Sequence, residues 1–255
     1  MDVPVATRIF ALLVCIAILW RMFGAKRGVQ YFIRRIPGID AIEEALGRAT
    51  EMGRPIVFTP GIDTLSNMQV LAGLSVLGWV AKKCASLYVQ VIVPLAKPAV
   101  VPAAEEIVRN AYREAGAEEH FRTTNIRFIS EDQSAFAAGT VGILAREKAA
   151  AGFYFGAFGY ESLLISENGN RLGIIQVAAT ADYVQIPFFI CACDYTLIGE
   201  ELYAASAYLS RDPMQVGSLT GQDMAKAMIL LILLVGSIAA IFSGELNPVQ
   251  GLLGK

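Results

Sequence analysis

The chain has 255 residues with 21 basic and 23 acidic side chains, and its formal net charge of −2 gives no basic excess of the kind that nucleic-acid binding requires. The four cysteines do not form a disulfide framework, and with His120 as the single histidine they do not match a metal-binding pattern. We therefore predict no nucleic-acid partner, no metal and no cofactor. We expect the cysteines to be reduced thiols that are buried or embedded in the membrane.

The first element is an apolar run near the N-terminus. Residues 9–20 carry no charge and are bracketed by Arg8 and Arg21. With residues 3–7, Met22 and Phe23 the run reaches the ~20 residues that a membrane-spanning helix needs. A secretory signal peptide is the alternative, but no small-x-small cleavage site lies between the run and Arg21. We expect an uncleaved transmembrane anchor over residues 1–24.

Basic residues follow this run and form a candidate membrane-surface group. They alternate with Tyr31, Phe32 and Ile33, a pattern typical of an amphipathic segment on anionic headgroups. A solvated flank that obeys the positive-inside rule explains the same residues, and the sequence leaves both interpretations open. The group comprises Arg21, Lys26, Arg27, Arg34 and Arg35, with Lys226 before the second apolar run.

Residues 25–220 read as one α/β domain, because apolar runs rich in β-branched residues alternate with segments of helical periodicity. Pro102 suits the first turn of a helix, and Ser130 with Gln133 resembles a capping box. The predicted strands are residues 55–59, 88–95, 125–129, 152–158, 174–180 and 187–193. The predicted helices are residues 39–52, 64–86, 102–116, 134–150, 160–167 and 198–210, with a turn at 168–170.

This alternation predicts the fold class. Strands separated by helices form parallel sheets with helices on both faces, and uninterrupted apolar strands suit a sheet that is buried on both faces. We predict a Rossmann-like, doubly wound, mainly parallel sheet of about six strands, flanked by one transmembrane helix at each terminus. The fold pattern hosts many functions and does not by itself choose one.

The last element is a second apolar run. Residues 227–242 carry no charge, and the run extends back through Met224 if Lys226 snorkels to the interface. Thr220 and Asp223 resemble a capping box, so we expect a helix over residues 221–244 and a short tail over 245–255. A buried core helix is the alternative, although a helix that is apolar all round favours lipid.

The distribution of basic residues predicts the orientation in the membrane. Five basic residues follow the first run and only Arg8 precedes it, while Arg211 and Lys226 precede the second run and only Lys255 follows it. Both asymmetries predict a cytoplasmic central domain with both termini on the opposite side of the membrane.

Candidate ligand-binding residues follow the predicted strands, because open α/β sheets bind ligands at the carboxyl ends of their strands. Acids and hydroxyls at this edge suit a cation, an amine or a sugar, but helix capping explains each of them as well. The candidates are Thr59, Gly61, Asp63, Glu131, Glu161, Ser162, Asp182 and Asp194.

Signatures of nucleotide binding and catalysis are weak. Gly152, Gly156 and Gly159 do not follow the dinucleotide G-x-G-x-x-G spacing, although the backbone around Gly61 could present N–H groups to an anion. The sequence contains no G-x-S-x-G elbow, and His120 has no evident nucleophile beside it. The sequence therefore favours a non-enzyme, without deciding the question.

Small residues suggest assembly. Gly73 and Gly78 in the predicted helix 64–86, and Gly236 with Ala240 in the C-terminal run, would allow close helix approach. We interpret the chain as a non-catalytic scaffold or accessory subunit of a membrane assembly, with the bilayer and either a second copy or a complex partner as its contacts. The alternative is an enzyme or sensor that binds a small molecule, such as a nucleotide or a sugar, at the carboxyl edge of the sheet.

Overall fold

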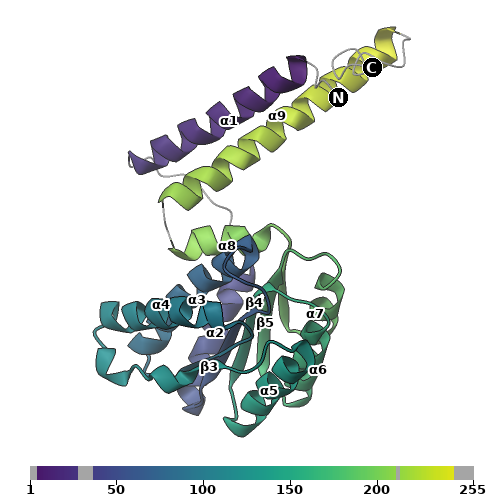
Figure 1. Cartoon of the computed structure of the whole chain (residues 1–255). Coiled ribbons are helices and arrows are strands. Elements are labelled where there is room, and N and C mark those ends of the chain that lie inside the picture. The colour runs from purple at the N-terminus through teal and green to yellow at the C-terminus, as the bar shows by residue number, and fades with distance from the viewer. Residues whose placement is uncertain (1–4, 28–36, 211–212, 244–255) are drawn as a thin grey trace. The chain divides into compact units, whose positions relative to one another are not determined.

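The computed structural model describes residues 5–27, 37–210 and 213–243, and the chain divides into two compact units. One unit consists of Met1–Arg34 with Arg211–Lys255, and its described helices are called the terminal helix pair below. The other, Arg35–Ser210, is an α/β domain and is called the Rossmann-like unit (Figure 1).

The Rossmann-like unit is built on a six-stranded sheet in the order β3-β2-β1-β4-β5-β6. Every neighbouring pair of strands is parallel, as the uninterrupted apolar strands predict. The order reverses between β1 and β4, which is the topological switch point of a doubly wound sheet. The strands are β1 (Ile56–Gly61), β2 (Val91–Leu95), β3 (Ile126–Phe128), β4 (Ala151–Ala157), β5 (Ile175–Thr180) and β6 (Tyr195–Ile198).

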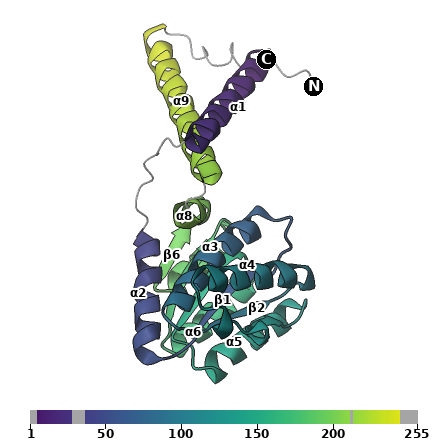
Figure 2. The ribbon, with the colours of Figure 1, turned by 90° about the vertical axis from the view of Figure 1, so that its left-hand side faces the viewer.

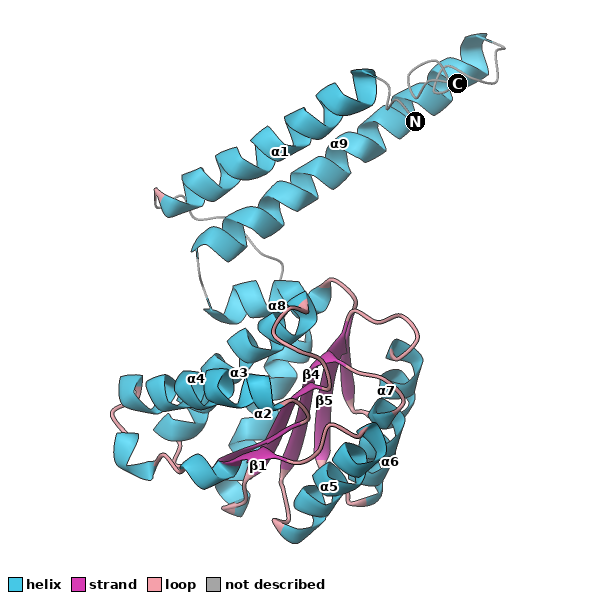
Figure 3. Ribbon diagram, in the orientation of Figure 1, coloured by secondary structure: helices cyan, strands magenta, loops and turns pink. Residues whose placement is uncertain are grey.

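Helices cover both faces of this sheet (Figure 3). One face carries α2 (Pro37–Met52), α3 (Met68–Ser86), α4 (Val101–Glu114) and α8 (Glu201–Ser210), and the other carries α5 (Gln133–Arg146), α6 (Glu161–Arg171) and α7 (Ile186–Ala192). Three short 3-10 helices, η1 (Pro98–Val100), η2 (Glu118–His120) and η3 (Thr123–Asn125), lie in the connections.

Each strand contributes side chains to two cores. In β4, Phe153 and Phe155 point to the α3 side, whereas Tyr154 between them points to the α5 side, as the two-residue period of a strand requires. Phe58 of β1 stacks on Phe155, with ring centroids 5.8 Å apart. Tyr154 stacks on Phe189 of α7 on the other face. Burial on both faces explains why these strands contain almost only apolar residues.

Helix α3 has more apolar surface than a sheet face alone would cover, and the structure shows where that surface goes. The helix packs between α4 and α8 and also contacts β1 and β4. At Gly78 a Cβ atom would lie 3.2 Å from Cγ2 of Ile107 in α4, and at Gly73 it would lie 1.9 Å from the carbonyl oxygen of Phe155. Both glycines therefore serve packing inside the unit.

The terminal helix pair consists of α1 (Val5–Lys26) and α9 (Pro213–Ser243). A Cβ atom at Gly217 would lie 2.7 Å from the Cα of Met22, and one at Gly221 would lie 2.8 Å from the Cα of Ile18. Because the numbers rise along α9 while they fall along α1, the helices run antiparallel. Figure 2 shows them crossing near this contact and diverging beyond it.

Within the described residues, one helix segment is long and apolar enough to cross a membrane, Pro213–Ile238 of α9. The prediction of one spanning helix at each terminus is thus supported, by length and composition, at the C-terminal end only. The helix also begins at Pro213, well before the expected start at residue 221. Thr220 is consequently not a cap: its hydroxyl donates to the carbonyl oxygens of Val216 and Gly217 inside the helix.

The predicted sixth strand is wrong. Residues 186–192 form helix α7, and the sixth strand is Tyr195–Ile198 instead. The short apolar run fits either element by periodicity, but Pro187 sits in the first turn of the helix, where a missing N–H does no harm. Phe189 and Ala192, three residues apart, are the buried face of this helix. The predicted turn at residues 168–170 is likewise the end of α6.

Candidate functional site

The carboxyl edge of the sheet at the switch point is formed by the segments that follow β1 and β4, and the two segments touch closely. Gly61 has a φ of +91°, and a Cβ atom there would lie 1.8 Å from the carbonyl oxygen of Ala157. In the same way, a Cβ atom at Gly156 would lie 2.0 Å from the carbonyl oxygen of Pro60. Only glycine fits at these positions, because any side chain would meet backbone. The backbone itself fills this part of the switch point.

Thr59 and Gly61, two of the predicted ligand-binding residues, bond to each other. The Gly61 N–H donates to Oγ1 of Thr59 over 3.2 Å, and Thr59 is fully buried. The hydroxyl thus supports the turn in which Gly61 takes its left-handed conformation. This arrangement explains both residues by the geometry of the β1 turn.

Asp63 caps the turn that leads into α3. Its carboxylate accepts hydrogen bonds from Nδ2 of Asn67 and from the N–H of Thr64, each over 2.7 Å. These two donors, followed by the positive charge of Lys97, lower the pKa of Asp63 below its usual value against the opposing effect of partial burial. Asn67 in turn caps α3 by accepting from the N–H of Gln69 over 2.8 Å. Asp63 therefore stays ionised and holds the cap.

Glu161 is a fully buried carboxylate at the start of α6. Its Oε1 accepts from the N–H of Gly159 over 2.7 Å, and its Oε2 accepts a short hydrogen bond from Nε2 of Gln133 in α5. The N-termini of α5 and α6 favour a negative charge here through their dipoles. Ser162 beside it is also buried and donates to Oε1 of Gln185 over 2.8 Å.

Asp182 follows β5 and caps the loop into α7. Its Oδ1 accepts from the N–H of Val184 over 2.8 Å, and its own N–H donates to Oγ1 of Thr180. Thr180 and Ala181 both donate to Oε1 of Gln69, which reaches across from α3. Asp182 and Asp63 thus belong to two segments that are linked through Gln69 and Asn67.

Three glutamines bridge the segments of this edge, a role that sequence reasoning did not find. It named only Gln133, in a capping box with Ser130, but the N-cap of α5 is Asp132 and the Gln133 side chain bonds to Glu161. Gln69 ties α3 to the end of β5, Gln133 ties α5 to α6, and Gln185 ties the start of α7 to α6. Gln69 lies two residues after the N-cap and Gln133 is the first residue of α5, so proximity to a helix start was the available signal. The residues that these glutamines bond to are distant in sequence, and proximity to a helix start does not reveal them.

Two remaining candidates lie apart from this network. Glu131 is exposed after β3 and lies 3.9 Å from Nζ of Lys97 after β2. Asp194 is misplaced by the prediction, because it precedes the true β6 and its Oδ2 accepts from the N–H of Gln176 near the start of β5. It therefore lies at the amino edge of the sheet, and only seven of the eight predicted residues share the carboxyl edge.

The charge of the carboxyl edge opposes an anionic ligand. One early N–H of α3 (Gln69), one of α5 (Ala135) and the Gly159 N–H before α6 already donate to the side chains of Asn67, Asp132 and Glu161, respectively. This leaves fewer of the donors that usually hold phosphate. Acids outnumber the neighbouring cation Lys97, which favours cationic or neutral molecules. Within the described residues no group of three or more His, Cys, Asp or Glu side chains is arranged to hold a metal ion.

The family comparison covers almost the whole chain. Residues 3–249 match a family model described as a domain of unknown function, DUF6754. The chain belongs to this family. Searches of curated proteins and of solved structures give no significant match. The family match spans the segments that form α1, the Rossmann-like unit and α9.

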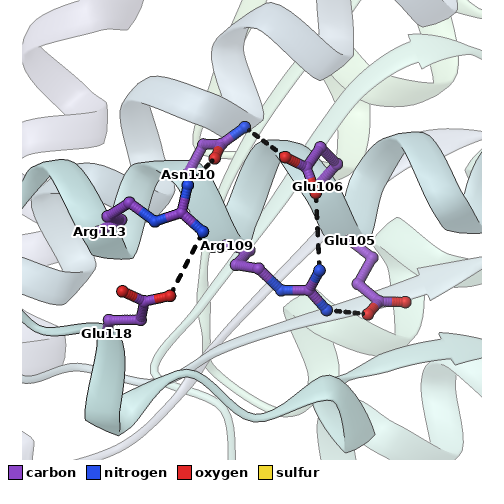
Figure 4. A network of polar contacts seen from close by, with 6 residues as sticks. All are labelled: Glu105, Glu106, Arg109, Asn110, Arg113 and Glu118. Atoms are coloured by element: carbon purple, nitrogen blue, oxygen red, sulfur yellow. Dashed lines mark hydrogen bonds and ion pairs between the residues drawn. The ribbon is translucent and has the colours of Figure 1, made fainter.

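Among the described residues of this DUF6754 chain, a charged network lies on α4 and reaches η2 (Figure 4). Arg109 pairs with Glu105 and Glu106, and Arg113 pairs with Glu118 over 3.4 Å. Pairs three and four residues apart on an exposed helix face are usual and add only a few tenths of a kcal/mol each. We interpret this network as a solvated helix surface.

The predicted membrane-surface residues are described only in part. Arg34 and Arg35 lie outside the described residues. Lys26 and Arg27 are exposed at the end of α1, whereas Arg21 is half-buried and reaches the sulfur of Met224 in α9 over 3.7 Å. Lys226 is exposed in α9 and lies 3.8 Å from Oδ1 of Asp223. Arg21 and Lys226 therefore make contacts within the terminal helix pair.

Proposed function

We propose that this DUF6754 protein is a non-catalytic scaffold or accessory subunit that holds its Rossmann-like unit at a membrane. The observation that carries the proposal is the exposed apolar surface of α9. From Ile229 to Val235 every side chain is an exposed large aliphatic group, and Ile238 is exposed as well. A surface that is apolar all round is unfavourable in water and is typical of a helix in lipid.

We further propose that α1 is a second membrane span, so that residues 1–24 and 221–244 flank a domain of residues 25–220. On the part of α1 whose side chains are described, Leu12, Ile16 and Leu19 are more than half exposed. The close antiparallel contact at Gly217 and Gly221 supports a pair of helices that enter and leave the same bilayer.

The orientation that we propose has the Rossmann-like unit in the cytoplasm and both termini on the opposite side. The antiparallel packing supports it, because Lys26 at the end of α1 and Pro213 at the start of α9 then belong to the same end of the pair. The basic residues next to this end favour the cytoplasmic surface.

The non-catalytic part of the proposal is supported by the bonding at the carboxyl edge. Asp63, Glu161 and Asp182 each accept a hydrogen bond from a backbone N–H, and the buried hydroxyls of Thr59 and Ser162 have partners within the unit. Satisfied caps of this kind stabilise loops without leaving a group poised for proton transfer or nucleophilic attack.

A second candidate function is binding of a small molecule at the carboxyl edge, as part of an enzyme or a sensor. The reversal of strand order between β1 and β4 favours this candidate, because doubly wound sheets bind ligands at that point. The hydroxyls of Ser134 and Tyr160, 2.8 Å apart and exposed above it, suit a sugar or another neutral polar ligand better than a nucleotide.

Native mass spectrometry of the full chain after mild detergent extraction tests the two functions together. A discrete homo- or hetero-oligomer without a bound small molecule is the expected result. A monomer or dimer that retains a small mass would favour the ligand-binding function instead. Extraction of membranes with alkaline carbonate is the companion measurement, since release of the chain into the supernatant would contradict a membrane-spanning protein.

A further inference from the structure

The register of α1 against α9 sets charged side chains level with the apolar part of α1. Gly217 lies against Met22 and Gly221 against Ile18, so Asp223 falls level with Ile16. Lys226 lies about 4.5 Å further along the axis of α9, at 1.5 Å per residue. Ile16 is near the middle of the uncharged stretch between Arg8 and Arg21. The ion pair between Asp223 and Lys226, 3.8 Å long, is therefore level with the middle of the α1 span.

This ion pair lies on the side of α9 that faces away from α1. Each residue turns the helix by about 100°, so Asp223 is about 200° and Lys226 about 140° from Gly221, which faces α1. Gln222 is exposed on the same side. The side chains of Asp223 and Lys226 are 65% and 49% exposed, in agreement with this direction. The polar side chains thus form one outward surface, called the polar face of α9 below.

At one level of the helix pair the two outward surfaces need different surroundings. The α1 side presents Leu12 and Ile16, which are 60% and 54% exposed, and these favour lipid. The α9 side presents Gln222, Asp223 and Lys226, which lipid does not solvate. Neither lipid alone nor water alone suits the helix pair at this level. Something other than lipid must therefore cover the polar face if the pair spans a bilayer.

We propose that the polar face of α9 packs against the same face of a second copy of this chain within the membrane. The inference rests on the proposed membrane-spanning function. It commits to a second copy because the face is self-complementary: it carries one acid and one base separated by about one turn. Two copies side by side then place each carboxylate within reach of the other copy's ammonium group.

The neighbouring residues suit the same partner. The amide of Gln222 contains both donors and an acceptor, so two such amides bond to each other in a symmetric pair. Leu230, 66% exposed about one turn beyond Lys226, lies on the same side and adds apolar contact. Polar groups that bond between helices, together with close aliphatic packing, are what holds helices together in lipid.

Disulfide cross-linking of the full chain in native membranes tests this pairing. Gln222→Cys is made in a background of Cys15→Ser and Cys191→Ser, which removes the exposed native thiols. Ile16→Cys is the matched control at the same level on the lipid side. With a mild oxidant we expect Gln222→Cys to yield mostly a species of twice the mass, and Ile16→Cys to yield at least ten-fold less. Equal yields, or no dimer from Gln222→Cys, would overturn the proposal.

Charge exchange tests the self-complementarity in the same assay. Asp223→Lys puts two bases on each face, so cross-linking through Gln222→Cys should fall about ten-fold or more. Adding Lys226→Asp restores one acid and one base per face and should restore the dimer. Unchanged cross-linking in the single variant, or no recovery in the double variant, would overturn the pairing.

Two further readouts separate the failure of this inference from the failure of the proposed function. Labelling of Gln222→Cys by a membrane-impermeant maleimide, without cross-linking, would mean that water covers the polar face and would overturn the pairing. Carbonate extraction of the same membranes reports on the span itself. A chain that resists extraction but does not cross-link loses only the pairing, whereas a released chain loses the proposed membrane function as well.

Discussion

The Rossmann-like unit and the terminal helix pair both rely on glycines for close contact, but they treat their large apolar side chains in opposite ways. In the Rossmann-like unit, Phe58, Phe153 and Phe155 are completely buried between the sheet and α3. In the helix pair, Leu230, Leu231 and Leu234 are more than 60% exposed. The first unit supplies its own apolar environment, whereas the exposed apolar side chains of the second have none within the described residues, which is the physical reason for the proposal that it lies in lipid.

The largest effect is expected at the switch point of the sheet. Gly61→Ala adds a Cβ atom 1.8 Å from the carbonyl oxygen of Ala157, at a φ that disfavours any side chain. We expect the free energy of unfolding to fall by about 4 kcal/mol or more, measured by denaturant unfolding in detergent. Gly53→Ala is the control, because it has a similar positive φ but open space around it, and should cost about 1 kcal/mol. Equal losses would contradict the role of backbone contact.

An arginine in the apolar part of α9 tests whether the terminal helix pair lies in lipid. Leu234→Arg places a charge in the apolar run and should disfavour insertion by about 3 kcal/mol. We expect a marked rise in the fraction of chain that alkaline carbonate releases from membranes. Leu163→Arg, on the exposed surface of α6, should leave that fraction unchanged. If both variants stay in the pellet to the same extent as the unmodified chain, α9 is not in lipid.

The buried carboxylate of Glu161 should matter next. Glu161→Ala leaves the Gly159 N–H and the Gln133 amide without their acceptor in a buried place, which lowers the free energy of unfolding by about 2 kcal/mol. Glu167→Ala on the exposed side of the same helix loses only an ion pair with Arg171 and should cost less than about 0.5 kcal/mol. A stable Glu161→Ala variant would favour a functional carboxylate over a structural one.

A smaller effect is expected where α1 meets α9. Gly221→Leu starts with a Cβ atom 2.8 Å from the Cα of Ile18, so the helices must move apart at a cost of about 2 kcal/mol. Hydrogen exchange in detergent should accelerate in α1 while the sheet keeps its protection. Ser237→Leu, on the exposed side of α9, is the control. Faster exchange of the sheet amides would point to a wider loss of structure than this contact explains, and unchanged exchange of α1 would refute the prediction.

The smallest effect concerns pH. The pKa of Asp63 is lower in the folded chain than in the unfolded chain, so its stabilising contribution is present above the unfolded pKa of about 3.9. The contribution disappears as the pH falls through the lower folded value. Because Asp63 is largely exposed, we expect it to be below about 0.5 kcal/mol after solvent screening. Asp63→Asn should therefore flatten the acid limb of the stability curve slightly, and a steeper limb would contradict the assignment.

Sequence reasoning located most of the candidate site because polar residues after parallel strands meet at one edge. It placed Asp194 at the wrong edge because an apolar run of seven residues fits a strand or a helix equally well by pattern. It attributed Gly78 to assembly between chains, whereas the neighbour of Gly78 is Ile107 of α4. A glycine pattern indicates that another element packs closely against the helix, but it does not indicate which element.

The sequence by itself determined most element types, though not that of residues 187–193, and the parallel, doubly buried sheet, because the period and composition of a segment reflect its solvent exposure. It also determined the apolar character of α9, which depends on composition alone. Only the tertiary structure decided that Gln69, Gln133 and Gln185 join the segments of the carboxyl edge. It alone decided that Asp223 lies level with Ile16, because the register of two packed helices is set by contacts between residues that are far apart in the chain.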